Sequence, residues 1–391
     1  MFKPFSKSSR QCVSKGYTLV ELMVAVVLSL LFLGLTFTLT GQLNNTGDLA
    51  GTMADVNENL RAGVNMVARD MSNSGAEIPF GGIPIPNGGT ATAINRPGPG
   101  VNNLVGTFPA SYTTLPVITP GDGLGPTQGS GGTQFSTDIV NIITVNPLSQ
   151  LDQKALKSVS YTNAAGTITV DPTTCGWGSP AAACPAGFLA ANAVVTPGQL
   201  IMLVQGNSSC LLTATAVNTT TGVVTFTKGD AADTLGLNQF AGPTGGTLAQ
   251  LLSGSPPATV TYAYHLSMVT YFLDTSTPRR LMRLVGTGCT NPPVATCPAA
   301  STGGPQAVAL GINVLQFAYS TSPLSNPDPT DKVPAVGPCT PSPCPGPAQI
   351  RKVNLWMIAE ADHRNRGTGQ YYSKSIATSV TIQNLAYFNK Y

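Results

Sequence analysis

One glutamate near the start of a long apolar segment is the most unusual charged residue of this sequence. In the stretch KGYTLVELMVAVVLSLLFLGLTF, residues 15–37, Glu21 is the only acidic residue. A carboxylate near the centre of a bilayer costs roughly 2.5 kcal/mol or more. That cost falls when a cation pairs with the carboxylate in the low-dielectric medium. The chemistry expected of Glu21 is therefore ion pairing, and a position at the headgroup boundary is the simpler alternative.

Six of the eight cysteines form three pairs that are close in sequence. The two members of each pair are separated by eight, seven and four residues in segments rich in glycine and proline. This spacing is typical of local disulfides in an oxidising compartment, although it does not fix their connectivity. Zinc is the alternative for the tightest pair, but no second tight pair or histidine cluster accompanies it. Cys210, next to an apolar run, is predicted to be a buried thiol. The cysteines predicted to form disulfides are Cys175, Cys184, Cys289, Cys297, Cys339 and Cys344.

Other residues with catalytic or metal-binding chemistry are sparse. His265 lies in an alternating strand pattern and His363 in a polar segment predicted to be a turn, so neither is expected to be catalytic. Asp328 and Asp331 could offer carboxylates to calcium, but a plain polar loop is the simpler interpretation. The sequence lacks the common motifs of hydrolases, zinc proteases and nucleotide-binding enzymes. We therefore expect a protein that is not an enzyme, with no cofactor and no metal.

Composition indicates a domain with many turns and few helices. Glycine and proline make up 74 of the 391 residues, and only 9 % of the residues are charged. The length allows two or three average domains or one elaborate domain with insertions, and the composition favours the second. The formal charge of +3 becomes −1 without the first 16 residues, which carry four basic side chains and no acidic one. This balance gives no indication of nucleic acid as a main partner.

The elements that must position Glu21 begin with a membrane segment. From Leu22 to Gly47 the chain has 26 uncharged residues, enough to cross about 30 Å of hydrocarbon as a helix. No convincing secretory cleavage pattern of small residues follows the apolar region. We therefore expect the apolar segment, residues 17 to about 40, to remain in the mature protein and to anchor it in the membrane.

The stretch KGYTLVEL, residues 15–22, resembles the processing site of type IV prepilins and type II secretion pseudopilins. Those proteins have a basic leader that ends in glycine, then an N-methylated residue, and a glutamate at the fifth mature position. The resemblance implies that prepilin peptidase removes residues 1–16 between Gly16 and Tyr17 and that Tyr17 is then N-methylated, although Phe or Met is commoner at that position. It also implies that the new amine, from the same or a neighbouring subunit, pairs with Glu21 and sets the register of subunits in a filament.

Beyond the membrane segment the helix is predicted to continue to about residue 75. No proline occurs between Tyr17 and Ile78, and an amphipathic pattern covers residues 52–74. The sequence SNSG at 72–75 is typical of a helix end. The apolar stripe of this half comprises Met53, Val56, Leu60, Val64, Val67 and Met71.

Residues 76–391 are predicted to form a β-rich domain, which makes the fold class α+β. Short β-rich runs alternate with turn-forming segments, and the clearest alternation lies near residues 260–268 and 315–319. These patterns favour an antiparallel sheet packed against the helix. The predicted strands are 138–145, 166–170, 199–205, 211–217, 222–227, 258–273, 280–285, 314–320, 352–361 and 375–385.

The succession of strand patterns from residue 269 to residue 387 resembles the C-terminal half of PilW-type minor pilins, whose plan J-type pseudopilins share. The resemblance implies a pilin-like fold and a minor subunit that primes pilus assembly and sits at the filament tip. It also implies that residues 85–135 and 163–256, approximately, are insertions, which surface loops tolerate because loop-closure entropy grows slowly with length. It implies a protein with one inner-membrane span and a periplasmic domain, which later enters the pilus. The implied partners are prepilin peptidase, other minor pilins, the major pilin, the inner-membrane assembly platform and inner-membrane lipid. A J-type pseudopilin of type II secretion and a tip-borne adhesin or binding module are the alternatives.

Overall fold

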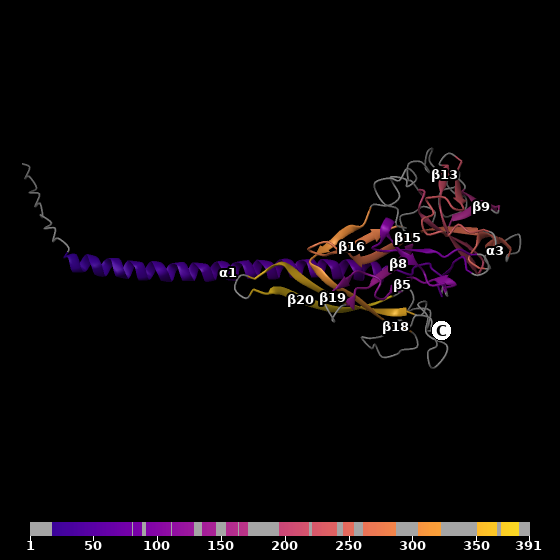
Figure 1. Ribbon diagram of the computed structural model, residues 1–391. Coiled ribbons are helices and arrows are strands. Elements are labelled where there is room, and N and C mark those ends of the chain that lie inside the picture. The colour runs from indigo at the N-terminus through magenta and orange to yellow at the C-terminus, as the bar shows by residue number, and fades with distance from the viewer. Residues whose placement is uncertain are drawn as a thin grey trace, which may run out of the picture.

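The structure is a computed structural model with a long N-terminal helix and a domain of antiparallel sheets, which confirms the predicted α+β, pilin-like class (Figure 1). The structure describes the following parts of the chain. These are residues 18–79, 81–87, 91–110, 112–128, 135–145, 154–162, 164–170, 195–218, 221–240, 245–253, 261–286, 304–321, 350–365 and 369–382.

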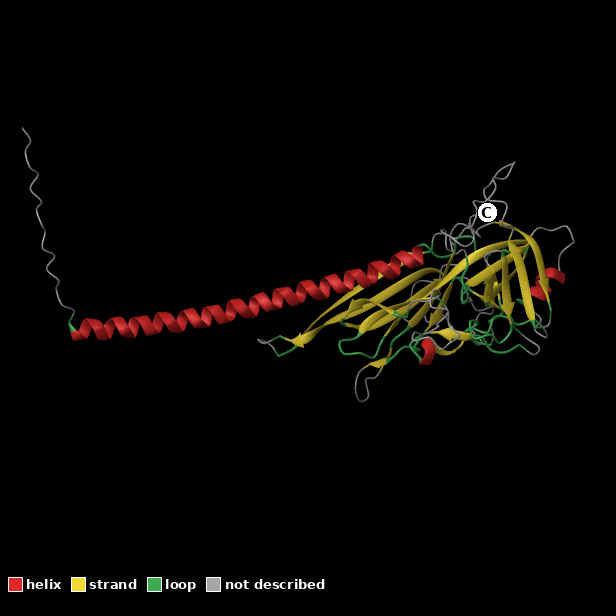
Figure 2. Ribbon diagram, turned by 90° about the horizontal axis from the view of Figure 1, so that it is seen from above, coloured by secondary structure: helices red, strands yellow, loops and turns green. Residues whose placement is uncertain are grey.

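Helix α1, Leu19–Ser72, has 54 residues and is continuous, as the absence of proline allows. At 1.5 Å per residue it is about 80 Å long. Its first half extends from the β domain as a free rod, and its second half lies against the strands (Figures 1 and 2). The helix ends close to its predicted boundary, and Gly75 follows with a φ of +82°, a conformation that favours glycine.

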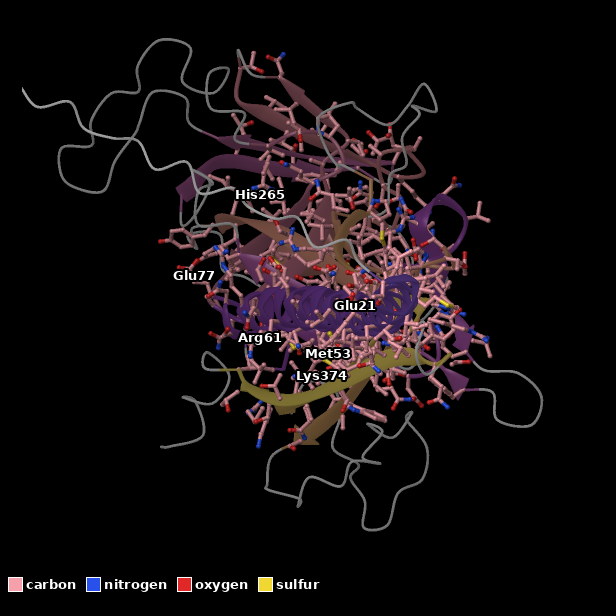
Figure 3. The ribbon with its side chains drawn as sticks, turned by 90° about the vertical axis from the view of Figure 1, so that its left-hand side faces the viewer. Glu21, Met53, Arg61, Glu77, His265 and Lys374 are labelled. Atoms are coloured by element: carbon pink, nitrogen blue, oxygen red, sulfur yellow. The ribbon has the colours of Figure 1, made fainter. Side chains whose placement is uncertain are left out.

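Two antiparallel sheets enclose the second half of α1. The larger has 11 strands in the order β12-β11-β15-β9-β10-β14-β13, with β8 and β16 also paired to β15, β5 to β8 and β17 to β16. The smaller has the order β18-β19-β20. Seen along its axis, α1 lies between the two sheets (Figure 3). The strands of the two sheets are β5 Ile118–Gly121, β8 Ile139–Val145, β9 Lys154–Tyr161, β10 Ala165–Val170, β11 Leu200–Gln205, β12 Ser208–Thr213, β13 Ala216–Asn218, β14 Val223–Thr227, β15 Thr261–Leu273, β16 Arg280–Val285, β17 Gln306–Leu310, β18 Ile312–Thr321, β19 Ile350–Arg364 and β20 Tyr371–Thr381.

Short elements complete the described fold and pack around the ends of the two sheets. They form three small two-stranded sheets, a single 3₁₀ turn and one short helix. These elements are β1 Ile83–Pro84, β2 Asn95–Pro97, η1 Val101–Asn103, β3 Leu104–Thr107, β4 Thr114–Leu115, β6 Thr127–Gln128, β7 Phe135–Ser136 and α3 Leu248–Ser253.

Gly311 lets the chain pass from the larger sheet to the smaller one. It separates β17 from β18, has a φ of +69°, and its backbone N–H donates to the carbonyl of Arg279. A Cβ at this position would lie 2.5 Å from the carbonyl oxygen of Glu360. Only glycine fits this crossing without strain, and the crossing is what folds the two sheets around the helix.

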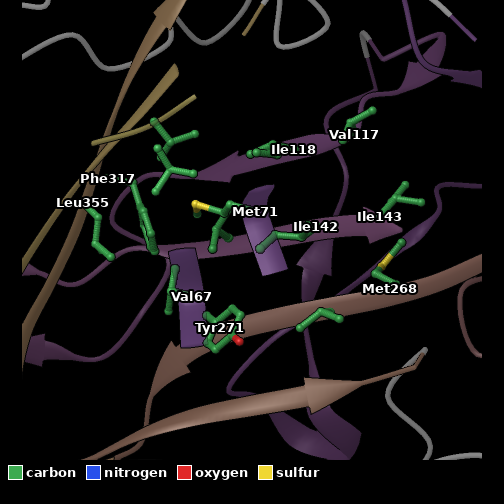
Figure 4. Packing of buried hydrophobic residues seen from close by; sticks show 14 of the residues in the cluster. Val67, Met71, Val117, Ile118, Ile142, Ile143, Met268, Tyr271, Phe317 and Leu355 are labelled. Carbon is green, nitrogen blue, oxygen red and sulfur yellow. The ribbon is translucent and has the colours of Figure 1, made fainter. Parts of the chain in front are cut away.

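The main core forms where α1 meets both sheets. Gly63 marks a close approach, because a Cβ there would lie 3.1 Å from Leu281 Cδ2 and 3.3 Å from Ala309 Cβ. Figure 4 shows Met71 of the helix packed among side chains of both sheets. The predicted apolar stripe is confirmed except at Met53, which is only partly buried. The buried members of the stripe are Val56, Leu60, Val64, Val67 and Met71.

A second core lies on the opposite face of β11, β12 and β15. Alternate residues of these strands point to the two cores, so Leu200 and Met202 belong to the main core while Ile201 and Leu203 belong to the second. Strands β10 and β14 and the short helix α3 cover this second core. Residues within the segment interpreted as an insertion, 163–256, thus supply strands of the larger sheet as well as the cover of its outer face.

Most predicted strands are present, with three differences. The single run predicted at 211–217 is divided between β12 and β13, because Thr215 leaves the β11 pairing and hydrogen-bonds with Thr225 and Thr227 of β14. His363, predicted to lie in a turn, belongs to the end of β19. Strands β5, β9 and β17 of the larger sheet were not predicted, and neither were the short strands β1, β2, β3, β4, β6 and β7.

Candidate functional site

Glu21 caps the free end of α1 in the structure. The backbone N–H and the hydroxyl of Thr18 both donate to Glu21 Oε2, at 3.0 and 3.1 Å, while the backbone N–H of Glu21 donates to Thr18 Oγ1 at 3.3 Å. This reciprocal arrangement is a capping box, and it satisfies two backbone donors that the first turn of a helix leaves unpaired. The carboxylate also lies at the positive end of the helix dipole. Glu21 therefore has a local role that the sequence prediction did not include.

Glu21 lies close in sequence to the Gly16–Tyr17 bond at which the leader is predicted to be removed. Gly16 and Tyr17 lie outside the described residues, so cleavage and methylation stay predictions. Thr18, whose N–H binds Glu21, is the residue immediately after Tyr17. A new amine on Tyr17 would therefore lie on the residue before the one whose N–H binds the carboxylate, and the pairing of this amine with Glu21 stays a prediction.

The helix surface that follows Glu21 is apolar and exposed. From Leu19 to Leu43 no side chain of α1 is buried, and Glu21 is the only charged residue. An exposed apolar surface of this length is unstable in water and is satisfied by lipid or by other apolar helices. By length and composition α1 can cross a membrane.

The hydroxyl groups in this exposed half are already satisfied within the helix. Ser29 donates to the carbonyl of Ala25 at 2.7 Å, and Thr36 donates to that of Phe32 at 2.8 Å. Thr38 and Thr40 repeat the same pattern at 2.8 Å. Such bonds remove the cost of placing a hydroxyl in hydrocarbon, where no water can bind it. These polar residues are therefore compatible with a membrane-spanning helix.

A partly buried ion pair fixes the other end of α1 to the larger sheet. Asp70 Oδ2 accepts a hydrogen bond from the hydroxyl of Tyr271 on β15 at 2.6 Å and one from Arg283 Nε on β16 at 2.7 Å. The side chains of Asp70 and Arg283 are 14 % and 25 % exposed. Burial, and with it the hydrogen bond to Asp70, raises the pKa of Tyr271 well above its usual value, so the hydroxyl stays a donor. This cluster, called the Asp70 clamp below, holds the rod in a fixed direction.

Two further contacts join α1 to the sheets near the point where it leaves them. The backbone N–H of Leu310 donates to Asn59 Oδ1 at 3.3 Å, and Thr52 Oγ1 lies 3.3 Å from His363 Nε2. His363 also contacts the carboxylate of Asp362. The β19–β20 hairpin thus reaches back along α1 toward its exposed half (Figure 1).

The remaining predicted residues divide into buried and undescribed ones. Cys210 is a buried free thiol, as predicted, and burial raises its pKa to about 12. His265 lies in β15, 5 % exposed, and burial lowers its pKa to about 4. The six cysteines predicted to form disulfides lie outside the described residues, as do Asp328 and Asp331.

The Asp70 clamp was missed by sequence reasoning. Tyr271 and Arg283 lie 201 and 213 residues after Asp70 in the sequence, so no local sequence pattern links the three residues. One signal was present: Asp70 lies in the last turn of a predicted helix, where the dipole disfavours a negative charge. An acidic residue at that position indicates a cationic partner elsewhere in the fold.

Comparison with known protein families gives a match at the exposed end of the helix. Residues 13–37 match the prokaryotic N-terminal methylation motif. The chain therefore carries a type IV prepilin-like signal. Its position, at the start of a free apolar helix that continues into a β domain, fits a membrane-anchored pilin-like or pseudopilin protein. No curated protein and no solved structure matches the sequence.

Proposed function

We propose that this protein is a minor pilin of a type IV pilus system. It is made with the leader 1–16, which prepilin peptidase removes, and it waits in the inner membrane with its β domain in the periplasm. It then combines with other minor pilins on the assembly platform, primes the filament and stays at its tip above the major pilin. The protein acts through assembly and not as an enzyme.

The observation that supports this proposal most is the division of α1 into two halves. The first half carries the methylation motif and exposes a mostly apolar surface on which Glu21 is the one charged residue from Leu19 to Leu43. The second half is held by the core and by the Asp70 clamp. A helix that was only an anchor would not need a carboxylate and a methylation signal at its start. A helix that moves from lipid into a bundle of similar apolar helices from other subunits needs a fixed register, and a buried charge pair supplies one because mispairing leaves a charge in hydrocarbon.

The β domain supports a minor subunit. Besides the main core around the helix, its strands form a second core on the outer face of the larger sheet, and no residue of α1 belongs to that second core. Such a large domain would crowd a filament in which every subunit carried it, whereas at the tip it has room.

Mass spectrometry of the mature N-terminus tests the proposal. The protein is isolated from cells with and without the peptidase, and its N-terminal peptide is sequenced. The expected result is a chain that begins at N-methylated Tyr17 only when the peptidase is present. A chain that begins at Met1 in both strains would overturn the proposal. Deletion of the gene then distinguishes the two systems: loss of surface pili supports the minor pilin, and loss of protein secretion with normal pili points to a J-type pseudopilin.

A further inference from the structure

A groove lies on the outer face of the smaller sheet, the face turned away from α1. Its volume is about 1100 Å³. Strands β18, β19 and β20 form its floor, and residues from the β5–β8 region, Asp122 and Phe135 among them, form one wall. The smaller sheet covers the helix with its inner face, so the groove opens away from the axis of the molecule (Figure 3).

Small neighbours leave an indole ring uncovered at the centre of this floor. Trp356 lies on the central strand and is 43 % exposed. Its cross-strand partners are Gln316 on β18 and Ala377 on β20, and neither is bulky enough to cover an indole ring. Phe135, 40 % exposed, adds a second ring from the wall. Large aromatic surfaces exposed in one groove are typical of a binding site.

The charges of the groove exclude acidic ligands. Among the described residues that line it, Asp122 and Asp138 are charged and none is basic. Phosphates, acidic sugars and nucleic acids would be repelled. Asp138 is 5 % exposed, and its two oxygens accept hydrogen bonds from the backbone N–H groups of Gly123 and Phe317, both at 2.9 Å. Its charge is therefore used to join β18 to the wall and is not a docking point for a cation.

The polar side chains of the floor indicate a ligand with hydroxyl groups. Gln316 and Asn354 point to the outer face from neighbouring strands, and each amide carries a donor and an acceptor. A cationic ligand would use only acceptors, and an apolar one would use neither. A sugar ring has an apolar C–H face and a rim of hydroxyls that both donate and accept, which matches an indole flanked by amides.

We propose that this groove is a binding site for neutral saccharides, with one sugar ring stacked on Trp356 and its hydroxyls bonded to Gln316 and Asn354. The inference does not depend on the proposed function, since it rests on the residues that line the groove. If the protein is a tip subunit, the site gives the filament a contact with surface glycans.

Tryptophan fluorescence of the full chain in detergent tests this proposal directly. The chain has two tryptophans, so in a Trp177→Phe background the emission reports on Trp356 alone. The probes are maltose, cellobiose, lactose and chitobiose, with a short Lys/Arg peptide as the cationic competitor. The expected result is a saturable change of emission with at least one of the four disaccharides and none with the peptide.

Affinities of variants, measured by isothermal titration calorimetry, distinguish a loss of stacking from a loss of folding. Trp356→Ala should weaken binding about tenfold or more, and Asn354→Ala about fivefold, because stacking and hydroxyl bonds are lost. Tyr161→Ala, which removes an aromatic ring 42 % exposed on another strand, should leave affinity unchanged. Unaltered circular dichroism shows that each variant folds. The proposal is overturned if none of the four disaccharides binds, if the peptide binds in their place, or if affinity is the same with and without Trp356.

Discussion

From the Asp70 clamp we predict that one conservative substitution, Asp70→Asn, lowers the free energy of unfolding substantially. Asp70→Asn keeps the size of the side chain and removes its charge, so Arg283 is left partly buried beside a neutral group. Hydrogen bonds to charged groups contribute about 1.5–3 kcal/mol each, and breaking a fully buried pair costs about 3–5 kcal/mol. Because Asp70 and Arg283 are 14 % and 25 % exposed, water recovers part of this loss. We expect a destabilisation of about 2–3 kcal/mol, or a fall in Tm of about 4–10 °C.

Thermal and denaturant unfolding of the full chain in detergent, followed by circular dichroism, measures this loss. Asp55→Asn is the matched control, because Asp55 is exposed on the same helix, and it should stay within about 0.5 kcal/mol of the parent. In a double-mutant cycle, Asp70→Asn and Arg283→Gln should show a coupling of about 1–2 kcal/mol. If Asp70→Asn unfolds at the same temperature as Asp55→Asn, the ion pair does not hold the helix and the reasoning is wrong.

Three further predictions concern the core. Gly63→Val should destabilise the protein by about 1–3 kcal/mol, because the new side chain overpacks against Leu281 and Ala309. Gly51→Ala, whose new Cβ lies in open space, should be neutral or stabilising by up to about 1 kcal/mol. Equal denaturation midpoints for the two variants would contradict the close packing at Gly63. Burial lowers the pKa of His265 to about 4 in the folded protein, below the unfolded value near 6.5. The free energy of unfolding should therefore be constant above pH 6.5 with respect to this group and fall by up to about 3 kcal/mol as the pH drops to 4. A His265→Leu variant should lose this pH dependence, and an unchanged dependence would mean that other groups cause it. Cys210 should resist thiol reagents at pH 8 in the native protein, because it is buried and burial raises its pKa to about 12. It should react after denaturation, as measured by mass spectrometry of the labelled peptide. Labelling of the native protein would show that the thiol is accessible and would contradict this prediction.

Sequence reasoning succeeded where structure is decided by local periodicity. The 3.6-residue stripe of α1 and the alternation of β18 reflect one buried face each, and a buried face is visible in any short window. In β15 both faces are buried along much of the strand, so its alternation located the strand but did not show which residues are buried. Strand β9 was missed because its sequence, KALKSVSY, is polar and gives only a weak alternation. Strand β17 was missed because its five residues, Gln306–Leu310, are too few to show a clear period.

The parts that could not be predicted are contacts between distant segments. The division of the 211–217 run depends on which strand each half meets, β11 or β14, and the sequence of the run does not contain that information. The groove around Trp356 requires three strands in one register. For Glu21 the sequence indicated a charge that needs a partner, and the structure added the capping box with Thr18.

That second role for Glu21 allows the central claim to be tested cleanly. Glutamine also completes a capping box, so Glu21→Gln keeps the helix cap and removes the charge, while Thr18→Ala weakens the cap and keeps the charge. The measurement is the fraction of the subunit recovered in sheared filaments relative to the membrane. If the charge sets the register of assembly, Glu21→Gln should leave the subunit in the membrane and Thr18→Ala should still assemble. Normal recovery of Glu21→Gln in filaments would contradict the account.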